Sequence, residues 1–326
     1  MPRSLIVKTS SLGDVVHMMP AIADMRAARP DFNVTWVIEE GFAPLVRLHP
    51  GVDVCIPVAM RRWRRGLVNS TTWHEIGAIR SHLGGQAFDA IIDTQGLLKS
   101  ALFARMARGP RHGYDWRSAR EPLSSLFYQH RHIVTRSQHA IDRNRALVAA
   151  ALGYPLSEAW SYGLSTVSAK QPAALARGER YAIVLHGTAQ PRKLWPDAHW
   201  RHIISHVADR GLIPVLPWGT DAEHERSLLL TEGRSETVVL PRMALDALAR
   251  VIAGADLVVS VDTGLAHLAA ALERPLVSIF GPTRPNLVRP RGSGYVSLLG
   301  GDGRFPDAKA VVDAIEDAMV QAGTSG

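Results

Sequence analysis

A polar loop after the first apolar run of the chain carries the first residues that can do chemistry. The segment LIVKTSSLGDVVH places Asp14 where an amphipathic pattern begins. Ligands of open α/β sheets bind at the carboxyl ends of strands, and the positive end of a helix keeps a nearby carboxylate ionised. Asp14 is therefore a candidate general base; the alternative is an ordinary N-cap aspartate. A dinucleotide-binding loop needs three glycines, and only Gly13 is present.

Two loops in the second half of the chain are suited to an anion. The segment HGTAQPRK at 186–193 offers the hydroxyl of Thr188 and then two cations, a combination that suits a diphosphate. The segment DTGLAH at 262–267 opens a predicted helix, whose free amides bind anions. The alternatives are a solvated basic loop for the first segment and, for the second, a Thr-Gly helix cap with Asp262 as a structural acceptor.

Four arginines crowd the segment RRWRR at 61–65, with no acidic residue among them. Such a cluster binds phosphates, and the interleaved Trp63 suggests stacking on a nucleic-acid base. The alternative is a solvated charged surface, which is the usual role of a charge run.

The histidines and the cysteine do not predict a metal site. His199, His202 and His206 share one face of a predicted helix, but no carboxylate is well spaced to complete a ligand set, so an exposed helix face is the preferred interpretation. Cys55 is the only cysteine, which excludes an internal disulfide and a cysteine-based zinc site.

Length and charge set the broad class of protein. A chain of 326 residues suits two domains of roughly 150 residues. Lys and Arg number 37 against 30 Asp and Glu, and the net charge of +7 favours phosphorylated ligands, an anionic membrane surface or nucleic acid. No apolar run reaches the ~18 residues of a membrane helix and no signal-peptide pattern opens the chain, so we expect a soluble, cytoplasmic protein.

The first half alternates short apolar strands with amphipathic helices, which indicates a parallel sheet covered on both faces. The predicted strands are Ser4–Lys8, Asn33–Ile38, Val54–Ile56 and Asp89–Asp93. The predicted helices are Asp14–Ala28, Thr72–Leu83, Gly96–Arg108 and His139–Leu152. Pro20 should kink the first of these helices or delay its regular start.

A second alternating series follows an irregular connection at 154–179. Its predicted strands are Tyr181–Leu185, Ile213–Pro217, Thr237–Leu240, Leu257–Val261 and Leu276–Phe280. Its predicted helices are Asp197–Arg210, Thr220–Glu232, Leu245–Ala253, Gly264–Leu272 and a last one at 307–322, which closes the second domain or packs back on the first. We therefore expect two doubly wound, Rossmann-like α/β domains, 1–160 and 161–326, facing a central cleft, the architecture called GT-B.

Segments along nearly the whole chain resemble the lipopolysaccharide heptosyltransferases, and among them the heptosyltransferase I family. The matching stretches are LIVKTSSLGDVVH, WVIEEGF, IPVAMRRWRR, DAIIDTQGLLKSA, HGYDWRSAREPLSSLFY, LPWG, VVSVDTGLAHLAAAL and the later GPT. The resemblance implies an inverting GT-B enzyme that moves L-glycero-D-manno-heptose from ADP-heptose to the first Kdo of Kdo2-lipid A. Asp14 is then the base that accepts the Kdo hydroxyl proton, and Lys193 stabilises departing ADP, with no cofactor or metal required.

The resemblance also assigns the ADP-heptose contacts. They are Thr188, Ala189, Lys193, Glu223, Met243, Asp262, Thr263, Gly264 and His267. Glu223 suits a ribose hydroxyl and Met243 suits the adenine ring. The family has two adjacent hydroxyl residues where this chain has Thr188-Ala189, so one phosphate hydrogen bond is missing here or comes from a backbone amide.

The expected acceptor side is basic. Its residues are Ser10, Ser11, Gly13, Arg61, Arg62, Arg64, Arg65 and Arg120. Guanidinium groups pair well with the carboxylates of Kdo and the phosphates of lipid A. The same charge favours a peripheral location on the anionic cytoplasmic face of the inner membrane.

Three other functions stay open at this point. A related heptosyltransferase would act on an already heptosylated core, although the arginine cluster and the segment AREPLSSLFY favour Kdo. A nucleotide-sugar- or NAD-binding protein would bind without transfer, and a nucleic-acid binder would use the basic surface. Substitution of Asp14 separates enzyme from binding protein, since only an enzyme would lose transfer while it keeps donor binding.

Overall fold

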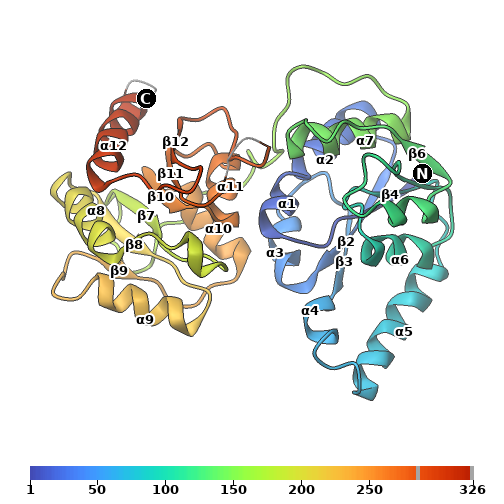
Figure 1. Ribbon diagram of the computed structural model, residues 1–326, viewed down its shortest axis with the longest axis horizontal. Helices are drawn as coiled ribbons and strands as arrows, with labels where there is room; N and C mark the ends of the chain where they lie inside the picture. The colour runs from blue at the N-terminus through green and yellow to red at the C-terminus, as the bar shows by residue number, and fades with distance from the viewer. Residues whose placement is uncertain (284–286, 324–326) are drawn as a thin grey trace. The chain divides into compact units, whose positions relative to one another are not determined.

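The computed structural model describes residues 1–283 and 287–323 and divides into two compact units, Met1–Leu164 and Ser165–Gly326 (Figure 1). The sequence predicted a boundary at 160/161 within an irregular connection, and the described chain has neither helix nor strand between Leu152 and Tyr181. Among the described residues, no helix is both long enough and apolar enough to cross a membrane.

Unit 1 is built on a parallel sheet with the strand order β3-β2-β1-β4-β5-β6. Its strands are β1 (Arg3–Val7), β2 (Asn33–Glu39), β3 (Val54–Val58), β4 (Ala90–Asp93), β5 (Arg111–Tyr114) and β6 (His130–His132). The central strands β1, β2 and β4 are almost entirely buried, as expected of apolar strands that helices cover on both faces.

The helices of unit 1 follow the strands as the sequence predicted, except that one predicted helix is divided and two short helices, Ala43–Val46 and Met60–Trp63, were not predicted. They are α1 (Leu12–Val16), α2 (Met19–Ala28), α3 (Ala43–Val46), α4 (Met60–Trp63), α5 (Ser70–Gly84), α6 (Leu98–Met106) and α7 (Ala140–Leu152), with short 3-10 turns η1 (Glu40–Phe42) and η2 (Pro122–Phe127). The helix predicted over 14–28 is two helices, α1 and α2. Pro20 lies in the first turn of α2, where its missing N–H loses no hydrogen bond.

Unit 2 has a second parallel sheet, with the order β12-β11-β10-β7-β8-β9. Its strands are β7 (Tyr181–Leu185), β8 (Ile213–Leu216), β9 (Val238–Val239), β10 (Leu257–Val261), β11 (Leu276–Phe280) and β12 (Val296–Gly300). Its helices are α8 (Asp197–Asp209), α9 (Asp221–Leu230), α10 (Leu245–Ala253), α11 (Gly264–Ala271) and α12 (Ala308–Gly323), with the 3-10 turn η3 (Pro191–Lys193). The two doubly wound sheets confirm the predicted fold class.

Three strands at or next to a sheet edge, β5, β6 and β12, were missing from the sequence prediction. The first two read RHGY and HRH and have no alternating apolar pattern. They are strands because the neighbouring strand supplies backbone partners, as when β5 pairs with β4 and β6 with β5. Pairing of this kind is a tertiary property that the local sequence does not encode.

The last helix, α12, packs on α8 and on strands β11 and β12 of unit 2. Val311 and Ile315 on α12 join Trp200 and Ile203 of α8 in one buried apolar cluster. Of the two predicted alternatives, the structure therefore selects the one in which this helix closes the second unit.

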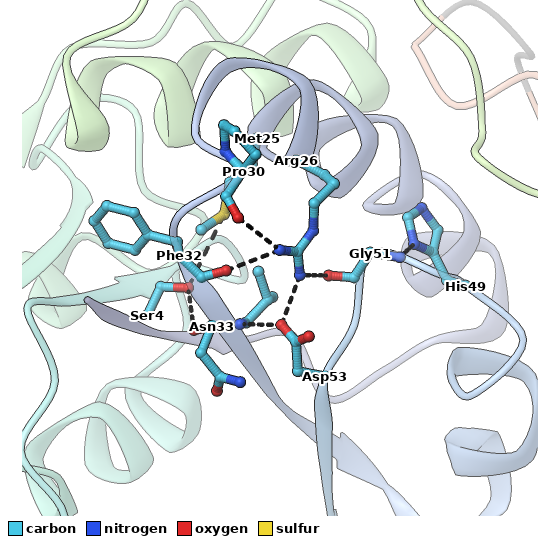
Figure 2. Close-up of polar contacts among 10 residues, drawn as sticks. Ser4, Met25, Arg26, Pro30, Phe32, Asn33, His49, Gly51 and Asp53 are labelled. Carbon is cyan, nitrogen blue, oxygen red and sulfur yellow. Dashed lines mark hydrogen bonds and ion pairs between the residues drawn. The ribbon is translucent and has the colours of Figure 1, made fainter. Parts of the chain in front are cut away.

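Arg26 on α2 ties together the loops that enter β2 and β3 (Figure 2). Its guanidinium donates to the carbonyl oxygens of Phe32 and Gly51 at 2.9 Å each, and to Asp53 Oδ2 at 2.6 Å. The same carboxylate oxygen accepts from the backbone N–H of Val34 at 2.7 Å. This cluster fixes the amino ends of the strands, opposite the edge where ligands of such sheets bind.

Two buried histidines make stability depend on pH. His49, beside this cluster, is 2% exposed, and its Nδ1 accepts from the backbone N–H of Gly51 at 3.0 Å. Burial lowers the pKa of His49 to about 4, and burial together with the Arg226 charge lowers the pKa of His186 to about 4. Each folded unit therefore holds a neutral histidine at a pH where the unfolded chain binds a proton.

We expect the free energy of unfolding to fall as the pH drops from 6.5 towards 4, because protonation of these histidines favours the unfolded state. Each histidine contributes about 2 to 3 kcal/mol over this range. Chemical unfolding at several pH values measures the effect, and His49→Gln should reduce the pH slope while the exposed-site control His202→Gln should not. An equal slope in wild type and His49→Gln would contradict the assignment.

Candidate active site

The candidate base lies where the strand order of unit 1 reverses. Strands β1 and β4 are neighbours at the centre of the sheet, and the chain leaves them towards opposite sides. Such a switch point leaves a crevice outside the carboxyl ends of the strands. The two loops that emerge here are joined, since Thr9 donates to Gln95 through its N–H at 2.8 Å and its hydroxyl at 2.9 Å.

Asp14 occupies the third position of α1, and Ser11 is the N-cap residue. Asp14 Oδ2 accepts from Ser11 N at 2.9 Å and from Ser11 Oγ at 3.0 Å. The alternative of an N-cap aspartate is therefore wrong in position, although the carboxylate does take part in a capping box. Both bonds use the same oxygen, so the cap and a proton-accepting role are compatible.

The charge of Asp14 is stabilised by neighbouring groups. Burial opposes its ionisation, but the positive charge of Lys8, the hydrogen bonds from Ser11 and the charge of Arg120 outweigh burial and hold the pKa of Asp14 below its usual value. Lys8 is only 7% exposed; burial lowers its pKa, and Asp14 and Asp93 oppose that shift. The sequence prediction did not include Lys8, although a lysine directly after a buried strand was a visible signal.

Asp93, at the end of β4, plays a different part from Asp14. It is fully buried, and burial raises its pKa despite donors that include the Tyr128 hydroxyl at 2.7 Å and the Gln95 N–H at 2.9 Å. Gly113 makes the tyrosine contact possible, because a Cβ there would lie 2.3 Å from the Tyr128 ring. The pKa values of the two carboxyl groups are thus shifted in opposite directions. Asp14 stays ionised, and Asp93 accepts hydrogen bonds that hold the loop after β4 and Tyr128.

Arg62 and Trp63 of the arginine segment make contacts within unit 1. Arg62 pairs with Glu75 at 2.9 Å and with Glu40 at 3.3 Å, so its charge is already compensated. Trp63 is buried in the core of unit 1 and donates to Glu75 at 2.5 Å. The expectation that Trp63 could stack on a base is therefore wrong, because the core already holds its ring.

The remaining acceptor candidates lie on the same unit. Arg61, Arg64, Arg65 and Arg120 are exposed, and no ion pair joins them to another residue within the described ranges. Arg61 also lies over the ring of Phe42, 5.1 Å from its centroid. Ser10 and Ser11 form the loop before α1, where Ser11 is exposed, and Gly13 is buried on that helix.

The candidate donor residues lie at the corresponding switch point of unit 2, where β7 and β10 are neighbours. Lys193 Nζ lies 2.6 Å from Asp262 Oδ2, and the two side chains are 14% and 15% exposed. Thr283 donates to the same oxygen at 2.6 Å, and the Thr188 hydroxyl donates to the Asp262 carbonyl at 3.4 Å. Asp262 is therefore the acceptor that links the segments of Thr188, Lys193 and Thr283. The alternative of a solvated basic loop is wrong for Lys193, because its side chain is mostly buried.

Glu223 acts as a helix cap beside this group. Its Oε2 accepts from the N–H of Gly219 at 2.8 Å and of Thr220 at 3.1 Å, which begins α9. Its Oε1 lies against Gly187, where an added Cβ would be only 2.4 Å away. The cap holds the carboxylate next to the loop after β7. A ligand bound at that loop could therefore donate a hydrogen bond to Glu223.

The other predicted donor residues follow the ends of β7, β9 and β10. Thr263 is the N-cap residue of α11 but makes no side-chain cap bond, and Gly264 begins the helix. His267 is buried on that helix, Met243 is half-buried after β9, and Ala189 is exposed. The backbone amides at the start of α11 thus remain suited to an anion.

Arg226 is a positioning residue that the sequence prediction missed. It donates to the carbonyl oxygens of His186 and Trp195 at 2.7 Å each, and it pairs with Asp197 at 2.6 Å. These carbonyls stand at the two ends of the loop that carries Thr188 and Lys193. No local pattern signals this role, because it depends on contacts across about thirty or forty residues of sequence.

The three histidines of α8 have separate surroundings. His199 packs edge-on against Trp195, His202 is exposed, and His206 lies 2.6 Å from Glu316 on α12. Over residues 1–283 and 287–323, no group of three His, Cys, Asp or Glu side chains is placed to hold a metal ion.

Comparisons with known proteins agree with this geometry. The profile of glycosyltransferase family 9 (heptosyltransferase) matches residues 76–311. Lipopolysaccharide heptosyltransferase 1 of Escherichia coli (strain K12) is 47% identical over 289 residues, 88% of this chain and 90% of that protein. The structure of E. coli heptosyltransferase WaaC with ADP has a TM-score of 0.90 and 44% identity, and covers 97% of this chain and 99% of that one. The same enzyme with ADP-2-deoxy-2-fluoro heptose has a TM-score of 0.88 and 44% identity, with the same coverage.

The two doubly wound sheets and the likeness to WaaC show a fold of the GT-B class, and the family match shows a glycosyltransferase. Within that class, the chain belongs to glycosyltransferase family 9 and is a heptosyltransferase.

We expect Lys8→Met to raise the pKa of Asp14. Burial raises this pKa, and the Lys8 charge is the largest of the effects that lower it. Carboxyl-carbon NMR of aspartate-labelled protein measures the shift, with Asp14→Asn to assign the signal. Lys170→Met in unit 2 is the control and should leave the titration unchanged. A wild-type titration curve in Lys8→Met would rule out this electrostatic role.

Proposed function

We propose that this heptosyltransferase moves L-glycero-D-manno-heptose from ADP-heptose to the first Kdo of Kdo2-lipid A, in the inner core of lipopolysaccharide. The observation that carries the proposal is the pair of switch-point sites: an ionised Asp14 in unit 1, and Lys193 beside Asp262 in unit 2. The name of the 47% identical relative and the ADP ligands of the WaaC structures support it.

In the proposed reaction, the Asp14 carboxylate accepts the proton of the attacking Kdo hydroxyl. The hydroxyl oxygen forms a bond to the anomeric carbon while the bond from that carbon to the β-phosphate oxygen breaks, and ADP leaves with the electron pair. Attack from the face opposite ADP inverts the anomeric configuration. A carboxylate with a lowered pKa is a weak base, so the proton transfers late, once the new bond has made the hydroxyl acidic.

Lys193 supplies the positive charge for the leaving diphosphate. The ion pair with Asp262 holds its ammonium at the carboxyl end of β10 before the donor binds. The Thr188 hydroxyl lies on the Asp262 carbonyl and the Thr283 hydroxyl on its carboxylate. We assign Thr283 the phosphate hydrogen bond that Ala189 cannot make, which requires its hydroxyl to turn from Asp262 to the phosphate. Thr263, Gly264 and His267 complete the phosphate side, and Glu223 and Met243 contact ribose and adenine. This set needs no cofactor or metal.

On the acceptor side, the exposed arginines Arg61, Arg64, Arg65 and Arg120 contact Kdo carboxylates and lipid A phosphates, and Ser10, Ser11 and Gly13 line the Kdo hydroxyl. Arg62 supports this surface through Glu40 and Glu75. The same charge holds the protein peripherally on the cytoplasmic face of the inner membrane. The alternative function is transfer of heptose to a core that already carries heptose.

We expect Asp14→Asn to lower the rate of transfer by about a hundredfold to ten-thousandfold while donor binding is kept, because the amide cannot accept a proton. The measurement is ADP release from ADP-heptose in the presence and absence of delipidated Kdo2-lipid A, with the surface variant Asp31→Asn as control. Full activity of Asp14→Asn would remove it as the base. Release with a heptosylated core alone would change the acceptor, and release with neither would refute transfer.

We expect Gly187→Ala to raise the KM for ADP-heptose by about tenfold and to change kcat less, because the new methyl group displaces Glu223 from its position. Gly77→Ala is the matched control, since a Cβ there meets no atom within 4 Å. Steady-state kinetics with varied donor separates the two constants. An unchanged KM would show that Glu223 does not contact the donor.

A further inference from the structure

Three large apolar side chains of unit 1 are exposed on the turn between α4 and α5 and on the first turn of α5. Leu67 is 55% exposed, Val68 102% and Trp73 59%. Single exposed apolar residues are common on soluble proteins, but three within seven positions form a local group that calls for a partner. In Figure 1 this connection extends away from the sheet of unit 1. We call residues 64–73 the tip.

Hydrogen bonds hold the tip in a defined conformation. The indole N–H of Trp73 donates to the carbonyl oxygen of Leu67 at 2.8 Å, which holds the ring against the turn. Asn69 caps α5 by accepting from the N–H of Thr71 at 3.0 Å. At the base, buried Trp63 anchors the segment through Glu75 at 2.5 Å. The apolar side chains are thus presented outward on a defined support.

The charge around the tip is positive. Arg64 and Arg65 are exposed, and no ion pair joins either of them to another residue in the described part of the chain. The acidic groups nearby, Glu40 and Glu75, are both engaged by Arg62. No acidic residue occurs in the sequence between Arg61 and Glu75.

Exposed apolar side chains next to exposed arginines are the combination that binds the headgroup region of an anionic bilayer. Tryptophan is favoured at that boundary, because its ring enters the apolar side while its N–H keeps a polar partner. Arginines next to the inserted residues contact headgroup phosphates. A nucleic acid would not account for Leu67 and Val68, which offer no stacking surface.

We propose that the tip is a membrane-insertion element: Leu67, Val68 and Trp73 enter the headgroup boundary of an anionic bilayer, and Arg64 and Arg65 bind its phosphates. This inference rests on the proposed function to the extent that the acceptor is a membrane lipid. It adds hydrophobic insertion to the charge attraction already proposed. Part of the membrane binding should therefore resist salt, which screens charge but not apolar burial.

The test is flotation of the full chain with vesicles of phosphatidylglycerol and phosphatidylethanolamine, at low and high salt. We expect Leu67→Ser/Val68→Ser to weaken binding by about tenfold or more and to abolish the salt-resistant part. The matched control is Leu228→Ser/Leu229→Ser, which replaces two apolar residues of unit 2 that are 52% and 55% exposed and should bind as wild type. Trp73 fluorescence, taken as wild type minus Trp73→Phe, should be quenched by brominated lipid.

Equal vesicle binding by wild type and the tip variant, or no quenching of Trp73, would overturn the proposal. So would concentration-dependent self-association that the tip variant loses in the absence of lipid, since the surface would then be a contact between copies. ADP release with delipidated acceptor is measured in parallel, and the tip variant should keep it. Failure of wild type in that assay refutes the proposed function, whereas failure in flotation refutes only the insertion.

Discussion

Both candidate sites follow from the order of the strands in the two sheets. In each unit the chain builds three strands outward on one side and then returns to build three on the other, so the first and fourth strands become neighbours. The helices that follow these two strands depart to opposite faces, and the carboxyl ends between them stay open. Asp14 and Asp262 both owe their positions to this reversal, which occurs once in each unit over the described residues.

Each switch-point site contains a cation and a carboxylate that are largely shielded from water. In unit 1 the buried Lys8 keeps Asp14 ionised, and the carboxylate is the group offered to chemistry. In unit 2 Asp262 holds Lys193, and the cation is the group offered. In unit 2, loss of Asp262 or of Lys193 would leave the other, mostly buried charge without its ion-pair partner, which costs on the order of 3 to 5 kcal/mol. The same device therefore serves a proton acceptor in one unit and an anion site in the other.

The arginine segment shows how one run of like charge can serve two purposes. Arg62 and Trp63 face the body of unit 1, where Glu75 accepts from both. Arg64 and Arg65 follow the short helix α4 outward and stay exposed. Because the inward pair fixes the backbone, the outward pair is presented in a defined place. A flexible basic loop would lose more conformational entropy on binding the same anion.

From the sequence we could predict the alternation of strands and helices, the two-domain organisation, and the polar loops that follow the strands at Asp14, Lys193 and Asp262. Those features are local, since apolar periodicity and loop composition can be read over ten or fifteen residues. Only the folded structure sets the pairing of strands β5, β6 and β12, the buried position of Trp63 and the contacts of Arg226. Each of these depends on groups from other elements of the chain, such as Glu75 on α5 for Trp63 and His186 after β7 for Arg226. Sequence spacing carries no information on such contacts until the sheets bring their partners together.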